Sequence, residues 1–447
     1  MVGDKPPPYA LLCAPGRSNC GWHDRAASIR CPPFWSGVAS HLRVWSWSRQ
    51  NEYLLIVSCL ITAVFLNWHM VGPVLPRFAL DFGVSIAEVS LLISAFTLAR
   101  ILLNFPGGAL TERIGRRPVF LAGGVIVAIA SIGSGLVNDF GQLVALRFLT
   151  GAGGALAVTT QVTIMADIST PRNRARLMSY SEGIISFGLF LGPGIGGFLG
   201  DAVGLRVPFF VAAALTLLAT AWALLRLPET RGWNMGLRPP GTGPGTRQPS
   251  VVEGVRTVLS DRNYVMITVL GLFVFFTRFA SFFFMLPILA YSLGMTPGEY
   301  GLVASGIALL QLPMLPLIGP LADRYGRKAL IVPTTVLTGL AVIGFGLAPD
   351  KVVFVLVAAF YALASGVSGP SGSTYLADVA PPRFRGIAVG LYRTAGDAAG
   401  FIGPPVLGAL AVAWSQGAAV VANGIGLCLV GLVFGIFARE TMVRSDP

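Results

Sequence analysis

Residues that lie 211 positions apart match along most of this chain, and this direct repeat constrains its fold more than any other feature. The stretch GALTERIGRR, Gly108 to Arg117, returns as GPLADRYGRK, Gly319 to Lys328. The same offset, without a gap, relates further residues, among them Asp167 and Asp378, Gly192-Pro193 and Gly403-Pro404, and Glu229-Thr230 and Glu440-Thr441. The sequence therefore predicts two homologous halves in tandem.

Apolar stretches of about 20 residues recur through both copies of the repeat, and a helix of that length spans a bilayer core of ~30 Å. Only 12% of the residues are charged and 54% are hydrophobic, whereas soluble domains carry roughly 25% charged residues. The alternating polarity of transmembrane strands does not occur. We expect an all-α membrane protein, a monomer with 12 transmembrane helices in two pseudo-symmetric six-helix bundles.

The composition also predicts the boundaries. Residues 1–50, rich in Pro, Ser, Arg and Trp, are expected to form a disordered tail. The N-terminal bundle then covers 51–230, a polar linker without an apolar helical period before Tyr264 covers 231–262, and the C-terminal bundle with a short tail covers 263–447. The predicted spans are 53–75, 89–110, 118–137, 140–163, 177–199 and 206–226, then 264–290, 300–321, 329–348, 351–374, 386–412 and 416–438.

The distribution of Lys and Arg predicts the orientation in the membrane. Of 32 such residues, the tail, the linker, the C-terminus and every second loop hold 25, and four lie inside predicted spans. Only Arg77, Arg206 and Lys351 lie on the other side. Because positive residues favour the cytoplasmic side, we expect a multi-pass plasma membrane protein with both termini and the linker in the cytoplasm.

Other classes of function find no support in the sequence. The net charge of +12 resides at the ends of apolar stretches, so nucleic-acid binding is not expected. The five cysteines show neither a pairing pattern nor the spacing of zinc ligands, and no P-loop for ATP occurs. Without a nucleophile constellation or a soluble domain, we expect no enzyme activity, no metal and no cofactor.

The doubled loop resembles the signature of the major facilitator superfamily, where it follows the second and eighth spans. Leu146-Arg147 with Gly151 resembles that family's R-x-x-x-G motif, and Pro228 to Gly232 resembles the PET-x-G sequence that ends a half. Span 5 resembles the antiporter motif of the 12-span drug:proton antiporter branch through Gly188, Gly192, Pro193, Gly196 and Gly197. The resemblance implies two bundles that rock about a central cavity between inward- and outward-open states.

The two signature loops, Gly108–Arg117 and Gly319–Lys328, repeat acidic as well as basic residues. Topology alone requires arginines but not matched acids, so we favour a charged gate that closes one arrangement of the halves. The alternative is that these charges only fix the topology. The predicted cytoplasmic gate, in which Arg116 and Arg327 reach Asp167 and Asp378, comprises Gly108, Glu112, Arg113, Arg116, Asp167, Gly319, Asp323, Arg324, Arg327 and Asp378.

Charged and polar residues inside the spans are costly in lipid unless they face partners or water. Because the offset relates several of them to polar positions in the other half, we expect them to turn inward. The alternative is static pairs that hold helices together. The predicted cavity and substrate residues are Asn67, Arg100, Arg147, Arg278, Gln311 and Arg393. With four arginines against two acids in the spans, we expect anionic, zwitterionic or neutral amphipathic substrates rather than cations.

The predicted proton-coupling residue is Asp397, followed by Glu182 and then His69. Asp397 lies four residues after Arg393 and thus on the same face of a helix. Many proton-coupled exporters carry an acid in the middle of span 1, but that region here reads Asn67-Trp68-His69.

The resemblance implies a secondary active transporter with alternating access that exports a small amphipathic organic compound, a drug or a metabolite, in exchange for protons. The alternative is an importer or facilitator of a sugar or an organic acid on the same scaffold. Both functions take a small-molecule substrate and the lipid bilayer as partners.

Overall fold

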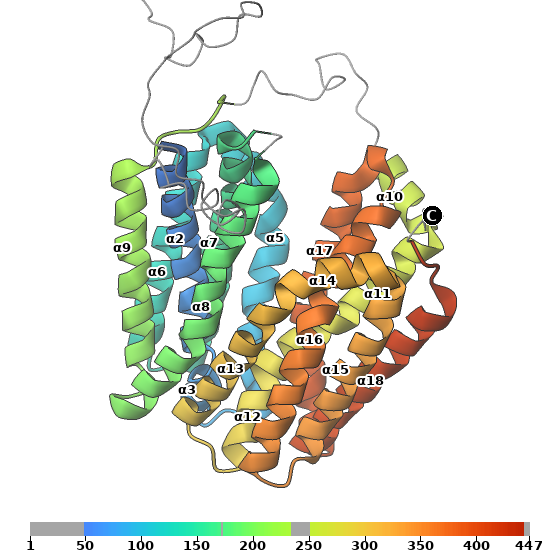
Figure 1. Ribbon diagram of the computed structural model, residues 1–447. Coiled ribbons are helices and arrows are strands. Elements are labelled where there is room, and N and C mark those ends of the chain that lie inside the picture. Colours follow the sequence, from blue (N-terminus) through green and yellow to red (C-terminus); the bar gives the residue numbers. More distant parts are fainter. Residues whose placement is uncertain (1–48, 171–172, 234–250, 442–447) are drawn as a thin grey trace, which may run out of the picture. The chain divides into compact units, whose positions relative to one another are not determined.

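The computed structural model describes residues 49–170, 173–233 and 251–441, and every regular element in these ranges is a helix. Residues 1–48 of the predicted tail and 234–250 of the predicted linker lie outside the described residues. We call 49–233 the first half and 251–441 the second half. Figure 1 colours the helices of the first half blue to green and those of the second half yellow to red.

The long helices of the first half coincide with the six predicted spans to within a few residues. Two short helices, α3 (Leu75–Leu80) and α4 (Ile86–Val89), connect the first two. The first ends at Val71 rather than at the predicted residue 75, because Gly72 and Pro73 follow it. The long helices are α2 (Arg49–Val71), α5 (Leu91–Ile114), α6 (Arg116–Leu136), α7 (Phe140–Ile168), α8 (Arg174–Ala202) and α9 (Val207–Arg226).

The second half is less regular. Predicted span 264–290 runs through α11 (Arg262–Phe276), a π-helix η2 (Thr277–Met285) and α12 (Leu286–Ser292). Predicted span 300–321 divides at a 3-10 turn η3, because Pro313 lacks the backbone N–H that a continuous α-helix needs. The other elements are α13 (Pro297–Gln311), η3 (Leu312–Met314), α14 (Leu315–Tyr325), α15 (Arg327–Leu347), α16 (Lys351–Val379), η4 (Pro382–Phe384), α17 (Arg385–Ala413) and α18 (Gln416–Phe437).

One helix lies within the predicted linker and contradicts the expected lack of an apolar helical period there. Helix α10 (Val251–Ser260) precedes α11, although we expected no apolar helical period before Tyr264. It packs on α17, where Val258 is fully buried and Gly254 lies against Ile387. Its apolar residues do follow a helical spacing, but over only ten residues, which is too short to stand out beside the long apolar spans.

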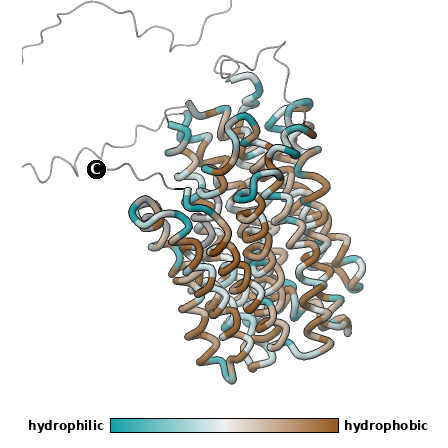
Figure 2. Tube along the Cα trace, turned by 90° about the vertical axis from the view of Figure 1, so that its right-hand side faces the viewer, coloured by the Kyte–Doolittle hydropathy of each residue, from teal (hydrophilic) through white to brown (hydrophobic). Residues whose placement is uncertain are grey.

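Ten helices in the described part of the chain are long and apolar enough to cross a membrane. In Figure 2 hydrophobic residues predominate along the helices, while hydrophilic ones are more frequent near their ends. Helices α13 and α14 are each too short, and α16 contributes a shorter apolar segment, Lys351–Val367. The total of twelve spans therefore stays a prediction.

The repeat reappears in the structure as matched helix caps. Asp139 and Asp350, 211 residues apart, cap α7 and α16 by accepting hydrogen bonds from backbone N–H groups of the first turn. Capping boxes begin α4 and α13, formed by Ser85 with Glu88 and by Thr296 with Glu299. Equivalent sequences thus build equivalent helix starts in both halves.

Buried side chains form one cluster in each half and a third that the halves share. Phe120 belongs to the first-half cluster and Tyr375 to the second-half cluster. The shared cluster includes Phe78 from α3 and Phe284 from η2. The described residues of the two halves therefore pack on each other near α3, α4 and α12, whereas near the signature loops their clusters remain separate.

Among the helix pairs that join the halves in the described part of the chain, α5 with α17 and α8 with α13 make the most extensive contacts. In the first pair, Ser94 Oγ donates to the carbonyl of Phe401 at 2.7 Å. In the second, the N–H of Gly194 donates to Ser305 Oγ at 2.8 Å. The second pair borders the cavity described next.

Candidate functional site

A cavity of about 260 Å³ lies between the halves and is walled mostly by the second half. The first half contributes only His69 of α2 and three residues of α8. A concave, mainly apolar wall with a few polar groups is the usual form of a small-molecule site. The polar and aromatic lining residues are His69, Ser186, Thr277, Arg278, Phe282, Phe283, Gln311, Thr335, Thr338, Tyr361 and Ser365.

Arg278 is the charged residue of this wall. It lies on η2, and a π-helical turn moves the side chains that follow out of α-helical phase. Its side chain is exposed although it sits in the middle of a predicted span, so the exposed surface belongs to the cavity. Tyr361, whose ring stacks on Phe282 with 6.1 Å between centroids, lies within electrostatic reach of the guanidinium. A cation at this depth is tolerable because water or a ligand can reach it.

His69 is buried on α2 and lines the same cavity. Its Nδ1 lies 2.7 Å from the carbonyl oxygen of Phe65. A carbonyl only accepts, so Nδ1 donates, and Nε2 of the neutral ring is left as an acceptor. Nε2 has no partner among the described residues. The lining residue His69 therefore has a hydrogen-bond acceptor without a partner. It lies in the middle of predicted span 1, where the sequence has no acidic residue.

Asp397 of α17 is held by two side chains of α5 in the other half. Arg100 Nη2 lies 3.1 Å from Asp397 Oδ1, and Asn104 Nδ2 donates to Oδ2 at 2.9 Å. The side chain of Asp397 is 6% exposed, against 27% for Arg100. The partner of Asp397 is therefore Arg100 and not its helix neighbour Arg393, with which no described ion pair occurs.

The structure does not bring all predicted cavity residues together. Arg278 and Gln311 line the cavity, and Gln311 Nε2 donates to Ser365 Oγ at 2.9 Å. Asn67, Arg100, Arg147 and Arg393 are not lining residues. The repeat aligns positions along the helices, but the rotation of each helix about its own axis decides which residues turn inward.

Three of the predicted site residues lie outside the lining of the main cavity. Arg147 is buried beside a separate void of about 20 Å³, and its Nε has no partner among the described residues. Asn67 is buried, with Nδ2 unpartnered in the same part of the chain. Glu182, a predicted proton carrier, is exposed on α8 outside the cavity lining and lies within electrostatic reach of Arg393.

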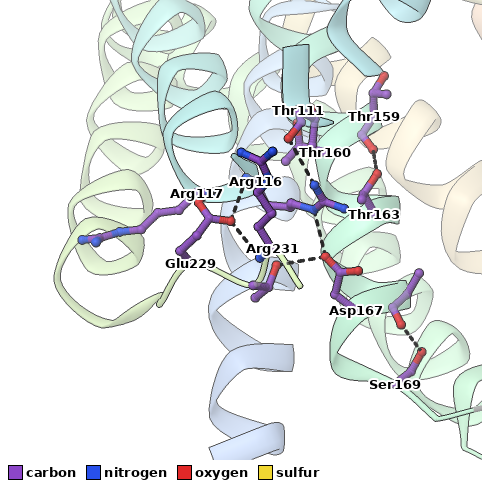
Figure 3. Close-up of polar contacts among 12 residues, drawn as sticks. Thr111, Arg116, Arg117, Thr159, Thr160, Thr163, Asp167, Ser169, Glu229 and Arg231 are labelled. Carbon is purple, nitrogen blue, oxygen red and sulfur yellow. Dashed lines mark hydrogen bonds and ion pairs between the residues drawn. The ribbon is translucent and has the colours of Figure 1, made fainter. Parts of the chain in front are cut away.

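The first signature loop forms a polar network within its own half (Figure 3). Arg116 Nε lies 3.0 Å from Asp167 Oδ2, which also accepts from Thr230 Oγ1 at 3.2 Å. Glu229 accepts from the backbone N–H groups of Arg116 at 2.9 Å and Arg117 at 3.1 Å. Its carboxylate thus caps α6, whose N-cap residue is a glycine without a side chain.

The second loop repeats this network at the 211-residue offset. Arg327 pairs with Asp378, which accepts from Thr441 Oγ1 at 3.2 Å. Glu440 accepts from the backbone N–H groups of Arg327 and Lys328, each at 3.0 Å, and so caps α15. The predicted contacts of Arg116 and Arg327 with the acids of spans 4 and 10 are confirmed.

Gly115 and Gly326 are required by this geometry. Their φ angles of 123° and 96° are rarely adopted by residues with a side chain. A Cβ on Gly115 would lie 2.6 Å from Glu229 Oε2, and one on Gly326 would lie 2.7 Å from Glu440 Oε2. The glycines therefore let each carboxylate reach the start of the following helix.

Burial raises the pKa of the Glu229 carboxyl, but hydrogen bonds from the backbone of Arg116, Arg231 and Arg117 outweigh it. The net result is a pKa below the ordinary value of 4.5. Glu229 therefore stays ionised at neutral pH, as a helix-capping carboxylate should.

The predicted gate joins elements of the same half in this structure. Each of the two described ion pairs of the signature loops connects residues of one half only. Glu112 is exposed without an ion pair in the described part of the chain, while the side chain of Asp323 and the surroundings of Gly319 lie outside the described residues. A role of these charges in closing one half against the other stays a prediction, as does that of Gly108, Arg113 and Arg324.

The glycines of span 5 lie at helix contacts. Gly188 and Gly192 pack against α2, where added Cβ atoms would lie 3.0 Å from the Thr62 carbonyl oxygen and 2.7 Å from His69 Cβ. Gly196 approaches the carbonyl of Met70, Gly197 approaches that of Pro297 in the other half, and Pro193 lines the cavity. These residues let α8 pack closely on both α2 and α13.

Several residues of these sites were not predicted from the sequence. Glu229 and Glu440 were visible as a repeated pair, but their capping role depends on contacts more than 100 positions away. Asn104 could not be predicted as a partner of Asp397, because a single amide in an apolar span has no distinguishing pattern and position 315 of the repeat is Leu. Tyr361 belongs to the cavity although the repeat gives it no aromatic twin, since position 150 is Thr.

Comparisons with known proteins agree with this architecture. The model of the Major Facilitator Superfamily matches residues 57–290 and 267–446. The quinolone resistance protein NorA of Staphylococcus aureus (strain MRSA252) is 22% identical over 393 residues, covering 87% of this chain and 97% of that protein. Multidrug resistance protein 2 of Bacillus subtilis (strain 168) is 24% identical over 374 residues, covering 82% and 90%.

Among solved structures, a D-xylose-proton symporter superposes with a TM-score of 0.69 at 19% identity, covering 87% of this chain and 99% of that one. At this identity the likeness concerns the fold. Family and relatives alike are transporters, so the chain is a membrane transporter and not an enzyme.

Proposed function

This chain belongs to the Major Facilitator Superfamily, and on that premise we propose that it exports a small amphipathic organic compound, a drug or a metabolite, in exchange for protons. The names of its relatives, which are resistance proteins, support export. The observation that carries the coupling is the ion pair of Asp397 with Arg100, because it joins α17 of one half to α5 of the other.

Ionised Asp397 binds Arg100 and Asn104 and thereby holds α5 against α17. Leaving the buried Asp397 ionised without its partner costs about 3–5 kcal/mol. A proton on Asp397 removes this attraction, and Arg100 keeps contacts on its own half over the rings of Trp68 and Phe96, at 5.6 and 5.9 Å. The halves therefore part at this point only when Asp397 is protonated. Glu182 and His69 are the second and third candidates.

The transport cycle in this proposal is alternating access between two six-helix bundles, 51–230 and 263–447, with twelve spans in all. The matched helix caps support the pseudo-symmetry, and the distribution of Lys and Arg supports cytoplasmic termini. With that orientation, the shared core near α3 and α12 closes the outer side. Each signature loop locks its own half, so that a monomer moves as two rigid units.

The test is transport by inside-out plasma membrane vesicles with an acidic lumen, against a panel of amphipathic compounds. We expect accumulation of at least one compound that depends on the pH gradient. Asp397→Asn is expected to lower gradient-driven accumulation at least tenfold while it retains exchange of labelled for unlabelled compound without a gradient.

Asp81→Asn is the matched control, because it removes an exposed carboxylate at the end of α3 that has no part in the ion pair. Full gradient-driven accumulation by the Asp397 variant would exclude this residue as the proton carrier. Equilibration by the wild type without dependence on the gradient would favour the alternative, a facilitator of a sugar or an organic acid.

A further inference from the structure

Arg278 is a cation in the cavity wall without a counter-charge. Among the described residues it has neither an ion pair nor a hydrogen bond, whereas Arg100 is neutralised by Asp397. None of the lining residues is an aspartate or a glutamate. The field in this cavity is therefore positive, and a bound cation would meet repulsion with no compensating charge.

Two further lining groups lack partners. His69 is 4% exposed and Thr335 is 1% exposed, and His69 Nε2 and Thr335 Oγ1 form no hydrogen bond with any described residue. Buried polar atoms of this kind are uncommon in folded proteins. Both groups belong to the wall that also contains Arg278. Thr335 Oγ1 can donate to an anionic ligand, whereas His69 Nε2 accepts only from a ligand that also carries an O–H or N–H group.

The apolar part of the wall offers aromatic rings. Phe282 and Phe283 meet edge to face with 5.2 Å between centroids, and Phe282 stacks on Tyr361. Such rings bind a flat aromatic body through its face or edge. The volume of about 260 Å³ lies just below the usual range for ligand sites, which limits the ligand to a small molecule.

We propose that the cavity binds small aromatic organic anions, with the carboxylate on the Arg278 guanidinium and the ring against Phe282 and Phe283. This inference rests on the proposed function and names its substrate class. A guanidinium matches a carboxylate with two parallel hydrogen bonds, which gives it direction as well as charge. Cationic and neutral compounds of the same shape lack that contact.

The test compares three probes with one ring system and different charge: 2-naphthoate, 2-naphthalenemethanol and 2-naphthylmethylammonium. Dissociation constants are measured by equilibrium dialysis against the purified full-length protein in lipid nanodiscs. We expect naphthoate to bind at least tenfold more tightly than the alcohol and the ammonium compound to bind most weakly. In Arg278→Gln, naphthoate should lose at least tenfold in affinity while the alcohol is unchanged.

Two variants keep the result interpretable. Arg278→Lys retains the charge but not the paired hydrogen bonds, and should bind naphthoate with an affinity between those of wild type and Arg278→Gln. Arg256→Gln removes an exposed arginine of α10 outside the cavity and should have no effect. Thermal unfolding in the same nanodiscs shows that each variant is folded.

Stronger binding of the ammonium compound, or naphthoate affinity unchanged in folded Arg278→Gln, overturns the inference. Failure of the proposed function looks different. If naphthoate binds through Arg278 but is not driven by a pH gradient, proton-coupled export is wrong and the anion site stands. If vesicles that contain the protein accumulate amines in response to the gradient, vesicles without it do not, and naphthoate does not bind, export stands and the substrate class is wrong.

Discussion

His69 combines a well-packed ring with a nitrogen atom that the protein does not use. The ring packs against Trp68 and Phe283, with 5.8 and 5.7 Å between centroids, and Nδ1 is bound to a carbonyl oxygen of its own helix. The unpartnered Nε2 costs about 1–3 kcal/mol if nothing binds it. We therefore expect Nε2 of His69 to contribute to ligand binding in the cavity and not to the stability of the fold.

The substitution His69→Phe keeps the ring contacts and removes the bare nitrogen. We expect the free energy of unfolding to stay level or to rise by about 1 kcal/mol. Transport of compounds that carry an O–H or N–H group should fall about tenfold, because one hydrogen bond is lost. Thermal unfolding and vesicle transport measure the two effects. Lower stability with transport intact would show that Nε2 serves the fold instead.

Helices α6 and α15 begin in the same unusual way. An ordinary N-cap is a Ser, Thr, Asp or Asn beside the first turn, as Asp139 is for α7. Here Gly115 and Gly326 occupy that place, and Glu229 and Glu440, from the segments that follow α9 and α18, supply the carboxylates. Each cap therefore ties the last helix of its half to the third, and only the folded half can form it.

The variant Glu229→Gln tests this element and its pH dependence. Because the folded pKa of Glu229 is lowered, its contribution is complete above the unfolded value of about 4.5 and is lost as the pH falls through the folded pKa. We expect a loss of about 0.5–1 kcal/mol at pH 7, since the group is largely exposed, and little further loss from this site in acid. Thermal unfolding between pH 3.5 and 7 measures both.

Glu112→Gln is the control for this experiment, because it removes an exposed carboxylate of the same loop that forms no ion pair with a described residue. An equal loss of stability in both variants would mean that net charge, and not the cap, matters.

Helix type and extent were largely readable from the sequence, whereas the irregular segments were not. A run of apolar residues predicts the length of a span but not the local helix type within it. The π-helical segment Thr277–Met285 carries the cavity arginine, yet its residues also suit an ordinary α-helix. Helix α10 was missed because its apolar period extends over only ten residues. Pro313 was a visible break signal that an otherwise apolar stretch obscured.

The pairing of residues across the whole molecule could be predicted only where the repeat supplied it. The contacts Arg116–Asp167 and Arg327–Asp378 follow from matched positions in two related loops. The contact of Arg100 with Asp397 joins residues that no offset relates, and it depends on how one half lies against the other. Helical spacing placed only Arg393 on the same helix face as Asp397, because such spacing relates neighbours on one helix and not residues of different helices.

Contacts between the halves near α3, α4 and α12 include one charged cap. Asp201, at the end of α8, accepts from Thr296 Oγ1 at 2.6 Å and from the N–H of Gly298 at 2.8 Å. A carboxylate of the first half thus caps α13 of the second. The 211-residue offset places Val412 at the equivalent position, so the pseudo-equivalent contact of α17 with α4 lacks this cap.

The end of the molecule near α3, α4 and α12, where the two halves are in contact, should therefore open more readily in Asp201→Asn. One hydrogen bond to a charged group is worth about 1.5 kcal/mol, which corresponds to about a tenfold shift in population. With the five native cysteines replaced by serine, a cysteine at the cavity-lining position Ala304 should react about tenfold faster with a membrane-impermeant maleimide added from that end. Asp81→Asn, at the same end but outside the contact, should leave the rate unchanged. Equal rates in both variants would mean that the apolar core shared by Phe78 and Phe284 holds this end closed without help from the cap.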